Sequence, residues 1–141
     1  MSKKPQVVIF KKKINRFNKS LYPDSDKSIS IRSFVIGSIS EGVSKVNNAL
    51  EGADVLAVIE CLRKLGSKIK KIKRGKYEIY GKGLGSFYCK KNTVLDFSNS
   101  GTGARLVQGC LATSPNIQVR LVGDKSLSKR SMKKIIRSME E

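Results

Sequence analysis

The sequence predicts a mixed α/β fold, in which helices lie on one side of small mixed sheets. Short apolar runs of strand character alternate with longer segments of helical periodicity. The order strand–helix–strand–helix–strand–strand over residues 6–80 is followed by strand–helix–strand–helix over residues 93–139, so the pattern begins a second time. Hydrophobic residues make up 39% of the 141 positions, which is enough for a packed core.

The first 22 residues are expected to form a strand and a linker. Gln6–Phe10 is a short run of strand character, and residues 11–26 are polar, turn-rich and contain Pro23. We therefore divide the chain into residues 1–22, which can belong to another domain, and residues 23–141, a partial α/β domain. The first apolar run is too short for a signal-peptide core, and no run approaches the roughly 20 residues of a membrane span. We expect a cytoplasmic protein with no membrane partner.

The first helix is expected from Lys27 to Ile39, where apolar side chains recur every four residues and form one buried stripe. Either Asp26 or Ser28 can cap its start with a side-chain oxygen. Glu41 and the glycine that follows it end the helix.

Turn residues and apolar patterns define the remaining elements. Gly66 is a natural residue just after a helix, and Arg74-Gly75 is a hairpin signal. Glycines at 81, 83 and 85 mark a loop, and Gly101–Gly103 is expected to be a tight turn. We expect strands at Ser44–Leu50, Ser67–Ile72, Tyr77–Tyr80, Thr93–Phe97 and Ile117–Val122, and helices at Asp54–Leu65, Arg105–Ala112 and Lys129–Met139.

The chain is strongly basic, with 29 Lys and Arg against 11 Asp and Glu and a net charge of +18. Such a charge favours anionic partners: nucleic acid, acidic lipid or phosphorylated metabolites. The densest basic run, residues 63–76, has apolar Ile69 and Ile72 within it, so part of it is typical of a strand with one solvated face. Aromatic residues, which stack on bases, are only 6% of the chain. A solvated basic surface is therefore favoured over nucleic-acid binding, and we expect no nucleic-acid partner.

Several kinds of site are excluded by composition. The chain has no histidine, which excludes Ser-His-Asp and Cys-His catalysis and any His-ligated metal. Three widely spaced cysteines, Cys61, Cys89 and Cys110, form no CxxC pair. They argue against a zinc site and a disulfide framework, and they fit a reducing cytosol. We expect no metal site.

Two segments have the character of anion cradles. At the start of the first helix, Lys27, Ser28 and Arg32 place an ammonium, a hydroxyl and a guanidinium near free backbone N–H groups. After the strand that ends near residue 97, Asn99, Gly101 and Thr102 lead into a helix whose first N–H groups can bind an anion. On spacing alone, an ordinary capped helix and an ordinary strand-to-helix turn remain open. A third basic cluster, Lys125, Lys129 and Arg130, is by itself more typical of solvated surface.

Three ordered motifs resemble the EPSP synthase family of enolpyruvyltransferases, over nearly the whole chain from residue 6 onward. The resemblance implies an amino-terminal portion of about a third of a family member. The family motif D-K-S-x-S-x-R is matched by Asp26-Lys27-Ser28-Ile29-Ser30-Ile31-Arg32. The motif N-S-G-T-x-x-R is matched by Asn99-Ser100-Gly101-Thr102-Gly103-Ala104-Arg105. The motif G-D-x-S-L-x-x-R-P-M is matched, with Ser131 in place of the proline, by Gly123-Asp124-Lys125-Ser126-Leu127-Ser128-Lys129-Arg130-Ser131-Met132.

The resemblance implies transfer of the enolpyruvyl group of phosphoenolpyruvate to the 5-hydroxyl of shikimate 3-phosphate, with release of phosphate and without a metal or organic cofactor. This reaction belongs to the shikimate pathway of aromatic amino-acid and chorismate biosynthesis. By matched position, Lys27 would be the catalytic residue and contact both substrates. The resemblance assigns shikimate 3-phosphate to Ser28 and Arg32 beside Lys27, and phosphoenolpyruvate to Gly101 and Arg130, with Asn99 and Thr102 shaping that cradle.

The resemblance also implies a fold: an inside-out α/β prism built of βαβαββ units, incomplete in this chain. We expect the chain to be an inactive amino-terminal fragment when alone, and the full-length protein to be a monomer. Two other functions remain open. One is a relative of the UDP-N-acetylglucosamine enolpyruvyltransferase, and the other is a small basic RNA-binding protein, for which charge is the only support.

Overall fold

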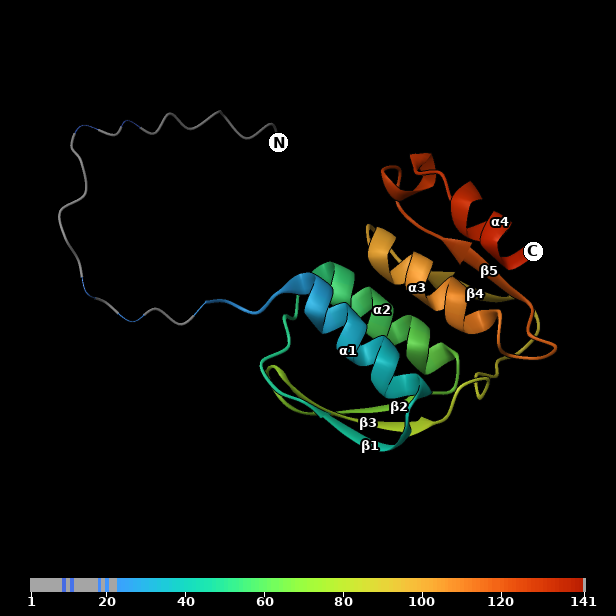
Figure 1. Ribbon diagram of the computed structural model, residues 1–141, viewed down its shortest axis with the longest axis horizontal. Coiled ribbons are helices and arrows are strands. Elements are labelled where there is room, and N and C mark those ends of the chain that lie inside the picture. Colours follow the sequence, from blue (N-terminus) through green and yellow to red (C-terminus); the bar gives the residue numbers. More distant parts are fainter. Residues whose placement is uncertain (1–8, 10, 12–17, 19, 21–22, 141) are drawn as a thin grey trace.

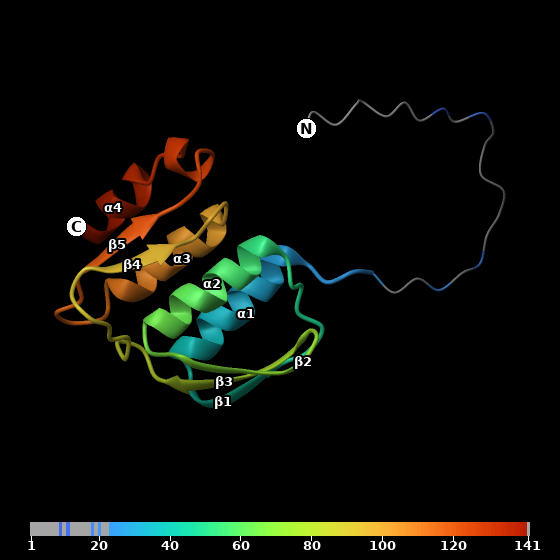
Figure 2. The ribbon, with the colours of Figure 1, turned by 180° about the vertical axis from the view of Figure 1, so that it is seen from behind.

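The structure is a computed structural model that describes residues 9, 11, 18, 20 and 23–140. Helices α1 and α2 pack on a three-stranded sheet. On their other side they contact helix α3, and α2 also contacts β4 of a two-stranded sheet, while α4 packs against α3 (Figures 1 and 2). The elements are α1 (Lys27–Ile39), β1 (Glu41–Val46), α2 (Ala53–Lys64), β2 (Lys68–Lys73), β3 (Lys76–Lys82), β4 (Thr93–Asp96), α3 (Gly101–Leu111), β5 (Val119–Val122), the 3₁₀ turn η1 (Leu127–Lys129) and α4 (Lys133–Glu140).

Helix α1 has the predicted bounds, and Asp26 is its cap. The Asp26 carboxylate accepts a hydrogen bond of 2.6 Å from the backbone N–H of Ile29, which satisfies one of the free donors of the first turn. Ile31, Phe34 and Val35 are buried on its inner face. The predicted apolar stripe therefore anchors α1 in the core.

Strand β1 begins and ends earlier than predicted: it covers Glu41–Val46, whereas we expected Ser44–Leu50. The reason is its pairing with β3, which runs antiparallel from Glu41 opposite Lys82 to Val46 opposite Tyr77. Beyond this ladder, Asn48 has a positive φ of 57° and turns the chain toward α2. A partner strand more than 30 residues away thus sets bounds that local apolarity does not reveal.

The three-stranded sheet has the order β1-β3-β2, and both neighbouring pairs are antiparallel. The predicted hairpin between β2 and β3 is confirmed, with Gly75 at a φ of 67° in the turn. Ile69, Tyr77 and Ile79 are buried on the face that covers the helices. The lysines of β2 are exposed, and Lys70 lies opposite Glu78 in the ladder. Part of the densest basic run is therefore a strand with a solvated side, as predicted, although of its two isoleucines Ile69 is buried and Ile72 is 51% exposed.

Strands β4 and β5 form a separate parallel pair, with Leu95 opposite Leu121. We predicted mixed sheets, and this prediction is wrong: within the described residues one sheet is wholly antiparallel and the other wholly parallel. Helix α3 connects the two strands as a crossover. The chain from β4 to α4 therefore keeps the predicted strand–helix–strand–helix order.

Two helix starts differ from the predictions. Gly101 and Gly103 lie in the first turn of α3, because the Ser100 hydroxyl accepts a hydrogen bond from the Gly103 N–H at 3.3 Å and begins the helix there. The last helix starts at Lys133, whereas we expected Lys129, because Arg130 has extended backbone angles after η1 and interrupts the helix.

One glycine that we expected in a loop lies in a strand instead: Gly81 is part of β3.

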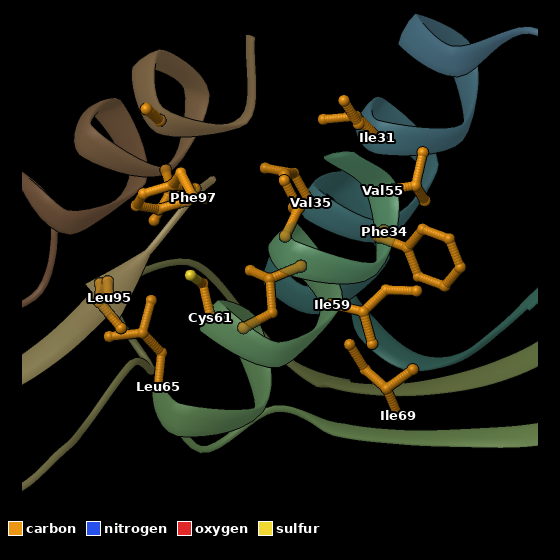
Figure 3. Packing of buried hydrophobic residues seen from close by; sticks show 14 of the residues in the cluster. Ile31, Phe34, Val35, Val55, Ile59, Cys61, Leu65, Ile69, Leu95 and Phe97 are labelled. Atoms are coloured by element: carbon orange, nitrogen blue, oxygen red, sulfur yellow. The ribbon is translucent and has the colours of Figure 1, made fainter. Parts of the chain in front are cut away.

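The main core lies where α1 and α2 meet the antiparallel sheet and β4. Figure 3 shows side chains from α1, α2, β2 and β4 meeting in one cluster, and Ile31, Phe34 and Leu95 are each fully buried. Cys61 of α2 points toward β4, and its thiol donates to the backbone oxygen of Asp96 at 3.2 Å. One core therefore joins the two rounds of the strand–helix pattern.

Two predictions on the amino-terminal region remain predictions. The strand expected at Gln6–Phe10 lies outside the described residues except for Ile9, and the assignment of residues 1–22 to another domain falls mostly outside them as well.

Among the helices of the described part, none has the length and apolarity that a membrane crossing needs.

Candidate anion-binding site

The second predicted cradle is built where β4 leads into α3. Asp96 at the end of β4 accepts a hydrogen bond of 2.8 Å from the Ser98 N–H, and Ser98 has a positive φ of 49°. The backbone oxygen of Ser98 in turn accepts from the Asp124 N–H at 2.9 Å. This turn therefore ties the start of α3 to the loop that follows β5, and it brings the second and third sequence motifs together.

Gly101 lies directly against two guanidinium groups. A Cβ atom at this position would be 2.7 Å from Nη1 of Arg130 and 3.0 Å from Nη1 of Arg105. A Cβ atom at these distances would displace the Arg130 guanidinium, so glycine allows the two guanidinium groups to approach the helix end this closely. Arg105 also donates to the backbone oxygen of Gly101 at 3.3 Å. Two positive charges thus gather at the amino-terminal end of α3, where the helix dipole already favours an anion.

A chain of side-chain hydrogen bonds orients Arg130. Nη2 of Arg130 donates to Oδ1 of Asn99 at 3.2 Å, and Nδ2 of Asn99 donates to Oδ2 of Asp124 at 2.7 Å. The hydrogen bond from Asn99 is the main cause that lowers the pKa of Asp124 below its ordinary value, helped by the N–H of Leu127. Asp124 is therefore ionised at neutral pH and can accept at both oxygens.

A cavity of about 170 Å³ adjoins this cradle. Phe97, Leu121, Leu127 and Met132 supply apolar walls, and Arg130 also lines it. The arrangement places a guanidinium beside a hollow with both apolar and polar walls, as ligand sites commonly have.

The first predicted cradle is arranged differently. Lys27 forms an ion pair with Asp54 in the first turn of α2, with 2.9 Å between Nζ and Oδ2. Arg32 donates from Nη1 to the backbone oxygen of Ser28 at 3.1 Å. Arg32 also lines a groove of about 540 Å³ between α1 and β1, together with Ile29 and Lys45. Within the described residues, the three predicted members of this cradle do not line one common pocket.

Both cradles lie at one end of the helix layer. Helices α1, α2 and α3 run side by side in the same direction, so that their amino-terminal ends lie together (Figures 1 and 2). The positive ends of three helix dipoles are thus added to the side-chain cations. The fold therefore creates a region of positive potential that suits ligands with several negative charges.

Three residues of this region were not assigned roles from the sequence: Asp54, Arg105 and Asp124. Arg105 and Asp124 belong to the quoted motifs, and Asp54 opens the predicted second helix, so each was visible as a residue. Their partners lie 27 residues away for Asp54 and 25 for Asp124, which local spacing does not indicate. Across the part of the chain that the structure describes, no cluster of three or more Cys, Asp or Glu is arranged to hold a metal.

A family model described as EPSP synthase (3-phosphoshikimate 1-carboxyvinyltransferase) matches residues 11–141. The chain belongs to the EPSP synthase family. It is 40% identical over 122 residues to the 3-phosphoshikimate 1-carboxyvinyltransferase of Parvibaculum lavamentivorans, which covers 86% of this chain and 27% of that protein. The protein of the same name from Bacillus velezensis is 38% identical over 131 residues, covering 93% of this chain and 30% of that protein.

The fold agrees with this assignment. The solved EPSP synthase of Acinetobacter baumannii matches with a TM-score of 0.74 at 38% identity, covering 83% of this chain and 26% of that chain. This EPSP synthase family chain therefore spans about a quarter to a third of the length of these relatives. The resemblance drawn from the three motifs is confirmed, as is the mixed α/β architecture.

Proposed function

We propose that this chain supplies the amino-terminal part of a 3-phosphoshikimate 1-carboxyvinyltransferase in the shikimate pathway. The reaction joins the 5-hydroxyl oxygen of shikimate 3-phosphate to C2 of phosphoenolpyruvate while C3 gains a proton. The tetrahedral intermediate then loses a proton from C3 as the bond between C2 and the phosphate oxygen breaks. The products are the enolpyruvyl ether and inorganic phosphate, and the phosphate carries the proton that the 5-hydroxyl has lost.

The Arg130 guanidinium held against Gly101 at the start of α3 is the observation that carries this proposal. We assign phosphoenolpyruvate to this cradle, with Arg130 and the Gly101 N–H as anion ligands and with Asn99 and Thr102 shaping it. The Gly101 N–H donates to the backbone oxygen of Asn99 at 2.9 Å, so it would exchange that acceptor for the ligand. A fixed positive group here stabilises the phosphate as it leaves, because it needs no reorganisation during the reaction.

Shikimate 3-phosphate is assigned to the amino-terminal end of α1. Ser28 is half-buried there, and the Lys27 side chain is 52% exposed, so an incoming phosphate can reach both. Arg32 would have to turn from the Ser28 backbone oxygen toward the ligand. Lys27 is the proposed catalytic residue that contacts both substrates. We assign no proton-transfer residue to this chain, since Asp96 and Asp124 are engaged in local hydrogen bonds.

The proposal includes the wider properties of the family resemblance. The fold would be part of an inside-out α/β prism of βαβαββ units, and the parallel helix layer between two sheets supports this. We also propose a cytoplasmic protein with no metal or organic cofactor, no membrane or nucleic-acid partner, and a monomeric full-length enzyme. On its own, the 141-residue chain is proposed to be inactive.

A chimeric enzyme tests the proposal. Residues 11–141 of this chain replace the matching segment of the Bacillus velezensis protein, and phosphate release from the two substrates is measured on the purified chimera. We expect turnover, and growth of a bacterium lacking EPSP synthase without added aromatic amino acids. Arg130→Ala should raise the KM for phosphoenolpyruvate on the order of tenfold or more. A chimera that folds, by circular dichroism and a cooperative thermal transition, but shows no turnover would contradict the proposal.

A further inference from the structure

We propose that Asp124 is a positioning residue: it fixes the direction of the Asn99 amide and, through that amide, the orientation of the Arg130 guanidinium. The inference rests on the proposed function in one respect, namely that Arg130 binds phosphoenolpyruvate. The hydrogen-bonded chain itself does not depend on that assignment. Asn99 lies in the loop between β4 and α3, whereas Asp124 and Arg130 lie on either side of η1 in the connection from β5 to α4. The tertiary fold therefore brings Asn99 to the other two.

The direction of the Asn99 amide is decided by its two neighbours. An amide has an NH₂ group at one end and a carbonyl oxygen at the other. The Asp124 carboxylate only accepts and the Arg130 guanidinium only donates, so a single orientation satisfies both contacts, at 2.7 Å and 3.2 Å. If the amide were reversed, its NH₂ would face the guanidinium and its oxygen would face the carboxylate, and both hydrogen bonds would be lost. Asp124 therefore determines which end Asn99 presents to Arg130.

Asp124 is itself firmly held. Its Oδ1 accepts a hydrogen bond of 2.7 Å from the Leu127 N–H at the start of η1. Its own N–H donates to the Ser98 oxygen at 2.9 Å, and its backbone oxygen accepts from the Ser128 N–H at 2.9 Å. Because three contacts fix this residue, its carboxylate can act as a fixed reference for Asn99 and, through it, for the exposed Arg130.

The use of an amide between the two charges has an electrostatic consequence. A carboxylate in direct contact with Arg130 would form an ion pair and compete with an incoming anion. The neutral oxygen of Asn99 holds Nη2 without cancelling the positive charge, and Nη1 remains beside Gly101. The other cradle shows the contrasting arrangement, since Lys27 is paired directly with Asp54. Asp124 therefore orients Arg130 from a distance that leaves the guanidinium available to substrate.

Asp124→Asn is the first test variant, made in the chimeric enzyme. The new side chain can still accept from the Leu127 N–H, but its NH₂ group faces the NH₂ of Asn99 and forces that amide to reverse. We expect the KM for phosphoenolpyruvate to rise about tenfold, while the KM for shikimate 3-phosphate and kcat change less than about twofold. Asp124→Ser keeps an acceptor for the Leu127 N–H and places no amide NH₂ opposite Asn99, because its hydroxyl proton can rotate away; it should give a smaller rise in the same KM.

Asp96→Asn is the matched control, because Asp96 holds the adjoining turn after β4 and the variant loses the same charge. Its carboxylate accepts from the Ser98 N–H, which an amide oxygen can replace, and it is assigned no contact with substrate. We expect the KM for phosphoenolpyruvate to stay within about twofold of the unsubstituted chimera. Equal effects of Asp124→Asn and Asp96→Asn would overturn the inference, since loss of charge alone would then explain them.

A second measurement separates this inference from the proposed function. In ¹⁵N-labelled 141-residue chain, the side-chain NH₂ resonances of Asn99 should shift in Asp124→Asn and Asp124→Ser, and should remain in place in Asp96→Asn. If the unsubstituted chimera has no turnover but these shifts occur, the proposed function fails and the positioning of Asn99 stands. If the Asn99 resonances do not respond to either change at 124, the positioning role is excluded whatever the activity.

Discussion

The two anion cradles of this chain use the same kind of helix start but prepare their cations differently. At α3, Arg130 is held through Asn99 beside Gly101, and it faces the amino-terminal end of the helix without a direct carboxylate partner. At α1, Lys27 is paired with Asp54, and Arg32 donates to a backbone oxygen of its own helix. A positive helix end is thus common to both cradles. Whether their cationic side chains are available to bind an anion depends on which acceptors the fold places next to them.

This difference implies that the two cradles must rearrange to different extents when a ligand binds. At the α3 cradle Arg130 can receive an anion with little rearrangement, and the Gly101 N–H has only to leave the Asn99 backbone oxygen, so affinity there depends mostly on the geometry already present. The α1 cradle must exchange protein acceptors for ligand oxygens before Lys27 and Arg32 can both bind. The predictions below test each side of this contrast.

The largest effect is expected from Gly101→Ala in the chimeric enzyme. The added Cβ would lie 2.7 Å from Nη1 of Arg130, so the guanidinium must move away from the helix end. Small displacements of a binding group can reduce catalytic efficiency on the order of 100-fold, and we expect a 10- to 100-fold rise in the KM for phosphoenolpyruvate. Steady-state kinetics with each substrate varied in turn measures this effect.

Gly109→Ala is the control for that change, because it lies in the same helix and a Cβ there has no heavy atom within 4 Å. Alanine is the better helix former, so this variant should be equally active and slightly more stable, by about 0.5–1 kcal/mol. If both glycine variants bind phosphoenolpyruvate as the unsubstituted chimera does, Arg130 is not held in the position that we assign to it.

The next largest effect is expected at the α1 cradle. Replacing Lys27 and Arg32 together by alanine should weaken binding of shikimate 3-phosphate to the 141-residue chain by about tenfold, measured by titration calorimetry or NMR. The matched control is Lys68→Ala with Lys70→Ala, which removes two positive charges from exposed β2 positions. That control should leave binding of shikimate 3-phosphate unchanged.

The same pair of variants tests the RNA-binding alternative. If the chain binds RNA through net charge alone, both double variants should weaken RNA binding equally, with a steep dependence of log K on log salt. Equal losses for RNA together with no measurable binding of shikimate 3-phosphate would favour that alternative. Binding of UDP-N-acetylglucosamine in place of shikimate 3-phosphate would favour the related sugar-nucleotide enzyme.

A smaller effect is expected on stability, from the loop that leads to Asp54. Glu51 accepts hydrogen bonds from Lys71 at 2.7 Å, from the Gly75 N–H at 2.7 Å and from the Tyr77 hydroxyl at 2.9 Å. The contact with Lys71 is the largest of the causes that lower the pKa of Glu51 from 4.5 to about 2. Because the folded pKa is depressed, this stabilisation is complete above about pH 4.5 and is lost as the pH falls toward 2.

Glu51→Gln should therefore lower the Tm at neutral pH, and the difference from the unsubstituted chain should shrink between pH 4.5 and 2. Thermal unfolding followed by circular dichroism across that range measures it. Glu60→Gln is the control, since the Glu60–Arg63 pair is exposed and such pairs contribute little. A constant Tm difference for Glu51→Gln at every pH would show that its ionisation does not stabilise the fold.

Among the three cysteines, Cys61 is expected to be alkylated most slowly. It lies on α2 against β4, where the two rounds of the strand–helix pattern meet. Its side chain is 1% exposed, and burial raises the pKa of its thiol to about 12. We expect no measurable alkylation of Cys61 at pH 8 in the folded chain, since the thiolate is the reactive form. Cys89, which is half-buried, should react faster, and all cysteines should react in denaturant. Mass spectrometry identifies each product, and rapid native labelling of Cys61 would mean that α2 and β4 separate readily.

Local pattern was sufficient for much of this molecule. The bounds of α1, the β2–β3 hairpin and the glycine after α2 follow from periodicity and turn chemistry within a few residues, and the structure has them as predicted. The motifs that indicated the family are also short and ordered, so they were visible without any structure. The region of positive charge followed from cations placed at expected helix starts.

The tertiary structure alone decided where β1 begins, why α4 starts late and which acceptor each cation meets. Strand β1 takes its register from β3, Arg130 reaches Asn99 across 31 residues, and Lys27 reaches Asp54 across 27. A side chain's partner depends on the packing of whole elements, and the free energy of that packing comes from many distant contacts and not from any short stretch of chain. For that reason the residue types of both cradles could be predicted, whereas the difference between a held guanidinium and a paired ammonium could not.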